Sequence, residues 1–304
     1  MGIRERQNPP AEEEMTDMRY TIDSEYAHLQ TYPWSGMNNG LYGIYNKYKN
    51  DVLDPTNFFT SHYDYELPYL IAASKNYEKA PYKIMVVGQE TMSWGGEFSH
   101  NNNYSPINPW NFEVEDYNVI LRNLKYPNDI LQALMLLYDE RVNKEWGLGG
   151  HLWQFYINLR SGLEKQAPYK FGLIHNNIAK IANKAGDKVD GVGSNYSINE
   201  SLIGMIKDEI TITDPNIIIC CLGNHNHYQK LVSFINPNIG ELVRTLSASN
   251  VVTDLSEIEI CNKSRKVICC YHPRYLNSKK GGIKTTTDKI ISMLRKAYNV
   301  SIIP

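Results

Sequence analysis

The sequence predicts an α/β protein, with a three-layer α/β/α domain built on a central, mostly parallel sheet of four strands. Four short apolar runs carry this prediction, and each ends in a polar or glycine-containing segment, as expected of strands buried on both faces. Segments with helical spacing of apolar residues separate the runs, which favours parallel strands joined by crossover helices. The runs cover residues 83–87, 171–174, 216–222 and 266–271.

The composition is that of an ordinary globular protein with a large core. The chain has 304 residues, of which 42% are apolar and 11% aromatic, enough for one large domain or for a domain with an appended cap. The formal net charge is -2, so no overall basic field indicates a nucleic-acid partner. Any contact with DNA would therefore need a local basic patch. We expect a monomer.

The cysteines and the hydropathy pattern indicate a cytoplasmic protein. The 5 cysteines fall mostly within apolar runs and show no C-x-x-C spacing, which favours buried thiols in a reducing compartment over zinc ligands or disulfides. No stretch reaches 18 apolar residues, and the charged start of the chain does not resemble a signal peptide. We therefore expect no membrane span.

Residues 1–80 are expected to form an N-terminal extension or cap on a main domain of residues 81–304. The first 16 or so residues are charged and contain proline, which predicts a disordered lead-in. Tyr42, Tyr45 and Tyr48 are spaced for one face of a helix. This helix would pack the cap onto the main domain; the alternative is a separate binding module.

The segments between the predicted strands are mostly helical. Ser197 with Glu200, and Thr285 with Asp288, match the capping box that opens a helix. Residues 94–112 are long and rich in Asn, which is typical of a functional or mobile loop. Residues 242–260 predict an irregular or antiparallel insertion. Helical spacing covers residues 116–138, 152–163, 197–210 and 285–298, and a further helix ends near residue 234.

Two of the predicted strands end in loops with polar residues that suggest one shared site. The first loop begins at Gly88 with a glycine, an amide and a carboxylate, and the second begins at His272 with a His-Pro pair. Open α/β sheets bind their ligands at the carboxyl ends of the strands. We therefore expect the two loops, together with the end of the strand near Ile174, to converge.

Three short motifs in this order resemble those of the uracil-DNA glycosylase superfamily. Gly88-Gln89-Glu90 resembles the GQD that opens its water-activating GQDPYH motif, and residues 272–276, His-Pro-Arg-Tyr-Leu, resemble its HPSPL motif. Between them, residues 173–180 are similar to its strand-end Asn motif, seen as LLLN or as N-x-x-K. The resemblance covers roughly residues 81–304. It implies hydrolysis of an N-glycosidic bond with neither a metal nor an organic cofactor.

The resemblance assigns catalysis to two residues. Glu90 stands where the superfamily has the Asp that activates water, and a Glu is one methylene longer. His272 matches the His that bonds the pyrimidine carbonyl and stabilises the departing base. Because Cys is absent before Cys220, the four-Cys iron–sulfur cluster of some branches is excluded.

The resemblance also implies residues that bind the base. Gly88 and Gln89 match the positions that touch the base carbonyl. Asn177 fits the Asn that reads the base edge if N-x-x-K sets the register, and Asn176 fits if LLLN does; an amide supplies both a donor and an acceptor. Met92 replaces the Tyr that excludes substituents at C5 of the pyrimidine. We therefore do not expect strict specificity for uracil.

A local DNA-binding patch is expected after His272. Leu276 matches the apolar wedge that fills the gap left by a flipped base, and Arg274 stands where the family has a phosphate-binding Ser. Lys279 and Lys280 then supply positive charge.

We accordingly predict a DNA glycosylase that removes a flipped-out uracil or modified pyrimidine from DNA, with the hypermodified cytosines of phage DNA as one candidate. Repair and phage defence are both compatible roles. The alternative is a nucleic-acid-binding protein that retains the fold without catalysis, which would account for the Glu at residue 90 and the Arg at residue 274. A nucleoside or phosphoester hydrolase on another fold is disfavoured, since no Gly-rich phosphate loop or metal cluster is evident.

Overall fold

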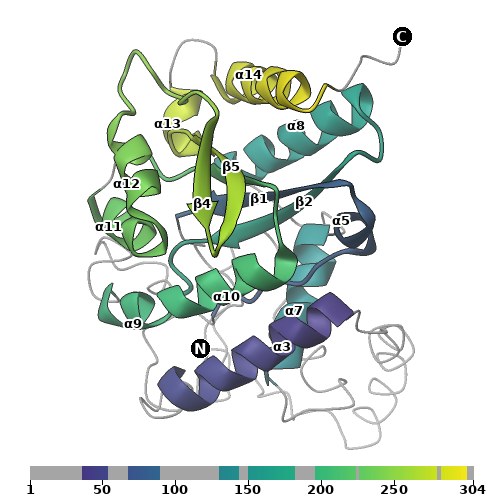
Figure 1. The fold of residues 1–304 in the computed structure, drawn as a ribbon, viewed down its shortest axis with the longest axis vertical. Helices are drawn as coiled ribbons and strands as arrows, with labels where there is room; N and C mark the ends of the chain where they lie inside the picture. Colours follow the sequence, from purple (N-terminus) through teal and green to yellow (C-terminus); the bar gives the residue numbers. More distant parts are fainter. Residues whose placement is uncertain are drawn as a thin grey trace, which may run out of the picture.

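The computed structural model has an α/β fold with a mixed, mostly parallel sheet (Figure 1). The sheet has five strands in the order β2-β1-β3-β5-β4. All neighbouring pairs are parallel except β4 with β5. The structure describes residues 36–53, 68–89, 130–143, 150–181, 196–223, 226–278 and 282–299.

The prediction of four strands was wrong by one, since a fifth strand pairs at the edge of the sheet. The four predicted runs correspond to β1 (Tyr82–Gly88), β2 (Phe171–Asn177), β3 (Ile217–Cys220) and β5 (Lys263–Cys269). The fifth, β4 (Ser256–Ile260), lies in the predicted insertion and is antiparallel to β5. Its exposed glutamates alternate with buried isoleucines, the pattern of a half-buried edge strand, so it contains no continuous apolar run.

β2 is longer than the sequence predicted, because three polar residues continue it. The predicted strand ended at Ile174, whereas His175, Asn176 and Asn177 remain paired with β1. β2 forms the other edge of the sheet, and Tyr138 supplies bonds on its open side. The Tyr138 hydroxyl donates to the His175 carbonyl oxygen over 2.8 Å and accepts from the His175 amide over 2.9 Å. The polar residues therefore lie inside the sheet rather than in a loop.

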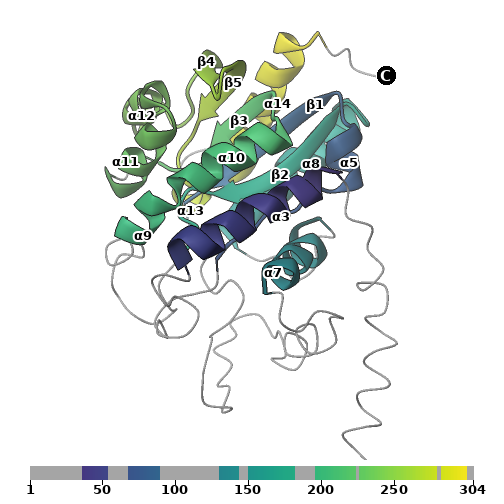
Figure 2. The same ribbon diagram turned by 60° about the horizontal axis from the view of Figure 1, so that its bottom comes forward.

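Helices cover both faces of the sheet. In Figure 1, α8 and α14 lie above the sheet, and α10 and α3 lie below it. Figure 2 shows α10 and α3 running side by side. The helices are α3 (Gly36–Tyr48), α5 (Lys75–Lys79), α7 (Ile130–Tyr138), α8 (His151–Gln166), α9 (Tyr196–Ser201), α10 (Ile203–Thr213), α11 (Asn226–Ile235), α12 (Pro237–Arg244), α13 (Pro273–Asn277) and α14 (Gly282–Ala297), with the π-helical turns η1 (Lys49–Leu53) and η2 (Asp139–Asn143).

Both predicted capping boxes lie inside helices rather than before them. Ser197 is within α9, which ends at Ser201, and α10 begins separately at Ile203. Thr285 lies within α14, which begins three residues earlier at Gly282. The S/T-x-x-E/D pattern also arises from polar residues one turn apart on an exposed helix face, so the motif alone misplaced both starts.

The described part of the N-terminal segment packs directly on the sheet domain. Asn38 in α3 exchanges two hydrogen bonds with the Ala73 backbone, at 3.0 and 2.7 Å. The hydroxyl of Tyr45 accepts the Ile71 backbone amide over 3.0 Å. Leu41 of α3 is also buried in the common core. α3 thus holds the extended segment 68–74, whereas the predicted disordered lead-in lies outside the described residues.

The cysteines are free thiols that are mostly buried, as the sequence predicted. Four of the five cysteines are buried, Cys261 is partly buried, and all are free thiols. Burial and neighbouring thiols raise the pKa of Cys221 and Cys269, so these sulfurs stay protonated. Within the described part of the chain, no helix is long and apolar enough to cross a membrane.

Candidate functional site at the carboxyl ends of the strands

The four parallel strands β2, β1, β3 and β5 have their carboxyl ends at the same end of the sheet. Gly88 at the end of β1 pairs with Asn177 at the end of β2. The Gln89 side chain donates to the Leu222 carbonyl oxygen over 2.7 Å, which ties β1 to the segment after β3. Next along, the Gly223 amide donates to the Cys270 carbonyl oxygen over 3.1 Å, two residues before His272. β1 and β5 flank β3, so their ends lie about 10 Å apart at ordinary strand spacing.

Gly88 is the point where side chains of two neighbouring elements converge. A Cβ atom at this residue would lie 2.6 Å from Asn177 Oδ1 and 3.1 Å from His175 Nε2. It would also lie 3.0 Å from Leu152 of α8. Any side chain here would push these three groups apart, which explains why glycine occupies the end of β1.

The structure separates Asn176 from Asn177 by the pleat of β2. Successive side chains of a strand point to opposite faces, so His175 and Asn177 lie on the face covered by α8. Asn176 lies on the other face, where its amide donates to Glu209 Oε2 over 2.9 Å and its Oδ1 accepts from Lys180 Nζ over 2.6 Å. Asn176 is therefore committed to the interior, and Asn177 is the one beside Gly88.

Asn176 is hydrogen-bonded to both members of a buried ion pair. Lys180 Nζ lies 2.7 Å from both carboxylate oxygens of Glu209, and both side chains are fully buried. The Tyr45 hydroxyl donates to Glu209 Oε1 over 2.8 Å. Burial lowers the pKa of Lys180, while Glu209 opposes that shift. Asn176 Oδ1 in turn accepts the Asn177 amide over 2.8 Å, so the pair supports the backbone at the end of β2.

His175 is a residue of this site that the sequence analysis missed. It is 0% exposed, and its ring packs against Trp153 and Tyr156 of α8, with centroids 4.7 and 6.0 Å away. Its Nδ1 lies 2.7 Å from the Tyr69 hydroxyl. Burial, and secondarily Lys180, lowers the pKa of His175 to about 3, so the ring is neutral at pH 7. The sequence did contain one indication of this role: His175 lies two residues before Asn177, and residues two apart in a strand share a face.

This lowered pKa predicts that acid destabilises the protein. The unfolded chain binds a proton on His175 below about pH 6.5, and the folded chain does so only near pH 3. The unfolded state therefore holds more protons in this window, and the free energy of unfolding falls as the pH falls. The loss from this residue should be about 2 kcal/mol by pH 5. Urea unfolding between pH 7 and pH 5 measures it.

Replacement of His175 tests the source of this slope. His175→Gln should flatten the dependence of unfolding free energy on pH. His272→Gln should flatten it by a similar amount, because the pKa of His272, at about 4, also lies below the window from pH 7 to pH 5. An unchanged slope in His175→Gln would contradict the assignment.

His272 lies directly before α13, three residues after the end of β5. As the N-cap residue, its Nδ1 accepts the Arg274 amide over 3.3 Å. Burial, the Arg274 charge and His151 lower its pKa to about 4. A neutral ring whose Nδ1 accepts carries its proton on Nε2. His272 thus presents a neutral N–H donor.

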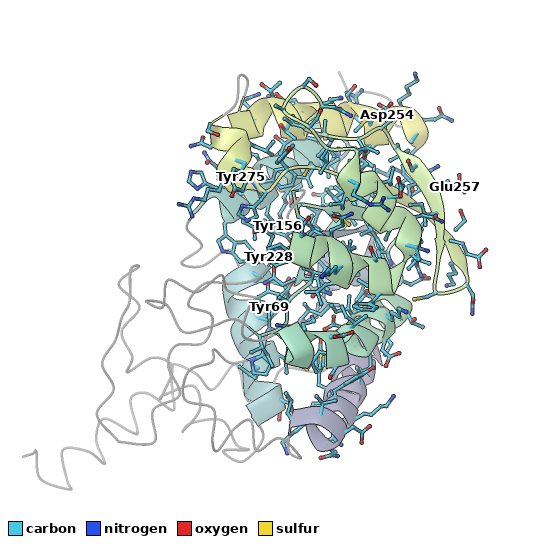
Figure 3. All side chains as sticks on the ribbon, turned by 90° about the vertical axis from the view of Figure 1, so that its left-hand side faces the viewer. Tyr69, Tyr156, Tyr228, Asp254, Glu257 and Tyr275 are labelled. Carbon is cyan, nitrogen blue, oxygen red and sulfur yellow. The ribbon has the colours of Figure 1, made fainter. Side chains whose placement is uncertain are left out.

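The three residues after Pro273 differ in exposure. Arg274 is exposed, as a phosphate contact requires. Leu276, the predicted wedge, is 1% exposed and belongs to the core. Tyr275 is 56% exposed and lies edge-on to Tyr271, with ring centroids 6.5 Å apart. Figure 3 shows Tyr275 on α13 at the rim of the molecule, with Tyr156 and Tyr69 further down the same side. Tyr275 is thus the exposed aromatic side chain of α13.

Four predicted site residues lie outside the described residues: Glu90, Met92, Lys279 and Lys280. The described site thus consists of Gly88, Gln89, Asn177 and His272 from the prediction, with His175 added and Asn176 assigned to the interior. Among the described residues, no group of three or more His, Cys, Asp or Glu side chains could hold a metal ion.

Comparison with known proteins adds no assignment: no family model matches the chain, and no curated protein does so either.

Proposed function

We propose that the protein is a DNA glycosylase with a uracil-DNA glycosylase-like three-layer domain, which hydrolyses the N-glycosidic bond of a flipped-out uracil or modified pyrimidine. The observation that carries the proposal is the placement of Gly88, Asn177 and His272 along one edge of the sheet, from three separate motifs. A flipped base must be recognised along its edge and released as an anion. The presence of all three motifs at the same end of the sheet supports one shared site for that base.

Each described residue suits one part of this reaction. Asn177 can read a pyrimidine edge because its amide both donates and accepts. His272 is neutral and carries its proton on Nε2, so it can donate to a carbonyl oxygen on which negative charge develops when the base leaves. Glu90 would place the attacking water and stabilise the positive charge on the sugar.

An excision assay tests the proposal directly. The purified protein is incubated with duplex and single-stranded DNA that carries uracil, hypoxanthine, 5-hydroxymethylcytosine or its glucosylated form. Release of one base, leaving an alkali-labile abasic site, is the expected result. Binding of DNA without release of any base would favour the alternative, a binding protein that has retained the fold without catalysis.

Binding to DNA should depend on the local basic patch. Replacing Arg274, Lys279 and Lys280 together by Ala should weaken binding to every sequence alike and reduce its dependence on salt, because phosphate contacts carry no sequence information. Titration of labelled duplexes at two salt concentrations measures both. The control replaces Lys263 by Ala. This exposed lysine is the first residue of β5, at the opposite end of the strand from His272, and it pairs with Asp214. Equal affinity of the triple variant and the natural protein would show that the patch does not bind DNA.

A further inference from the structure

His175 has one ring nitrogen engaged and one without a partner. Nδ1 is bonded to Tyr69, whereas Nε2 is buried and has no hydrogen-bond partner in the structure. His175 Nε2 is one of only three such side-chain atoms among the described residues. A buried polar atom left unpaired destabilises the fold, so an unused one beside the end of β1 calls for a reason.

The proton on the ring is expected at Nε2. The Tyr69 hydroxyl stays protonated, since burial raises its pKa well above the ordinary value. An imidazole nitrogen is a far more basic acceptor than a phenol oxygen, so we expect the hydroxyl to donate to Nδ1. The neutral ring then carries its hydrogen on Nε2 and can only donate there.

The ring is also held rigidly in one orientation. The Tyr138 hydroxyl bonds both the amide and the carbonyl oxygen of His175. The rings of Trp153, Tyr156 and Tyr69 pack edge-on or tilted against the imidazole. Four aromatic side chains and three hydrogen bonds fix a donor that has no acceptor. Such support is what a site needs when it must hold a recognition group to within a fraction of an ångström.

The donor is directed at the end of β1, inside the candidate site. His175 Nε2 and Asn177 Oδ1 both approach the point where a Gly88 side chain would begin. Glycine keeps that point free of a side chain. Nε2 therefore lies beside the residue that we propose to read the base.

We propose that His175 is a further substrate-binding residue, which donates Nε2–H to an acceptor atom of the ligand, either a carbonyl oxygen or an unprotonated ring nitrogen of the bound base. This rests on the proposed function and extends it. The donor has no acceptor capacity, so a ligand that presents only N–H groups at this point is disfavoured. Discrimination of this kind is strong, because a wrong ligand leaves the buried N–H unpaired.

The test compares His175→Phe with the natural protein on matched DNA. Phe keeps an aromatic ring of similar size and removes both nitrogens. Affinity is measured for duplexes with each of the four bases of the excision assay and for the same duplex with a tetrahydrofuran abasic analogue, which lacks the base. We expect His175→Phe to lose about tenfold in affinity for the preferred base and to bind the abasic duplex as before. An equal loss on both duplexes would show only a packing role.

Tyr69→Phe separates the donor from its support. This variant keeps Nε2 but removes the hydroxyl that sets the tautomer, so its loss on the base-containing duplex should be smaller. Nitrogen-15 NMR of the histidines provides a second readout: the His175 Nε2–H signal should be present in the free protein and shift when the base-containing duplex binds, but not with the abasic one. A proton on Nδ1 would overturn the inference. So would an Nε2–H signal that does not shift when the base-containing duplex binds.

The outcomes distinguish this inference from the function on which it rests. Excision that proceeds with an unchanged base preference in His175→Phe would defeat the role of His175 alone. Failure of every base in the panel to be released, with a His175 signal that still responds to one of them, would defeat catalysis and leave the binding role standing.

Discussion

Glu90→Gln is expected to slow single-turnover excision by on the order of 100-fold or more, equivalent to about 3 kcal/mol of barrier. The amide keeps the shape of the carboxylate and one acceptor oxygen but removes the negative charge that would stabilise the developing sugar cation. Binding to DNA should be unchanged or tighter. The measurement is release of the preferred base under excess enzyme, with duplex affinity determined in parallel.

His272→Ala provides the companion variant. It should also slow excision, through loss of the Nε2–H donor to the departing base, and the two effects need not add because both act on one transition state. Glu241→Gln, at an exposed carboxylate on α12, is the control for charge removal as such. Wild-type excision by Glu90→Gln would mean that the carboxylate is not catalytic and that the comparison with the GQD motif is wrong.

Lys180→Met is expected to destabilise the fold by about 3–5 kcal/mol. Met has a similar length and packs well, but its introduction leaves Glu209 buried without a cation. Desolvation of an unpaired charge is the dominant cost, and Asn176 loses a hydrogen bond as well. Urea unfolding at pH 7 measures the change in free energy.

Two controls separate the cost of burying an unpaired charge from the loss of an ion pair as such. The double variant Lys180→Met/Glu209→Leu should recover part of the loss, because no uncompensated charge remains inside. Glu164→Gln removes one partner of an exposed pair with Arg160 and should cost less than about 1 kcal/mol. A double variant less stable than Lys180→Met would contradict this, and would mean that Glu209 stabilises the fold through Tyr45 and Asn176 even without Lys180.

The ion pair also bears on the candidate site, because it bonds Asn176, the neighbour of the residue that we propose to read the base. Lys180 and Glu209 hold Asn176, and Asn176 Oδ1 accepts the amide of Asn177. A variant that keeps the fold but loosens this network should reduce discrimination among bases before it reduces affinity for DNA phosphates, since only the former depends on the position of Asn177.

The sequence by itself determined the α/β class of the fold and pointed to the strand ends that form the candidate site. Continuous apolar runs identify buried parallel strands because both faces of such a strand exclude water, and the sheet contains all four of them. The edge strand β4 escaped this criterion because one of its faces meets solvent. The resemblance of Glu90 to a catalytic residue stays a prediction, since it lies outside the described residues.

Tertiary structure alone decided the roles of the residues around Asn177. Motif alignment left Asn176 and Asn177 equivalent, and only the pairing of β2 with β1 fixed which one lies beside Gly88. The four-residue separation of Asn176 and Lys180 gave no hint that Glu209, 29 residues further on, completes their network. The sequence could not show that Nδ1 of His175 is bonded to Tyr69 while Nε2 has no partner. Local patterns report burial and direction along the chain, whereas hydrogen-bond partners come from distant segments that only the fold brings together.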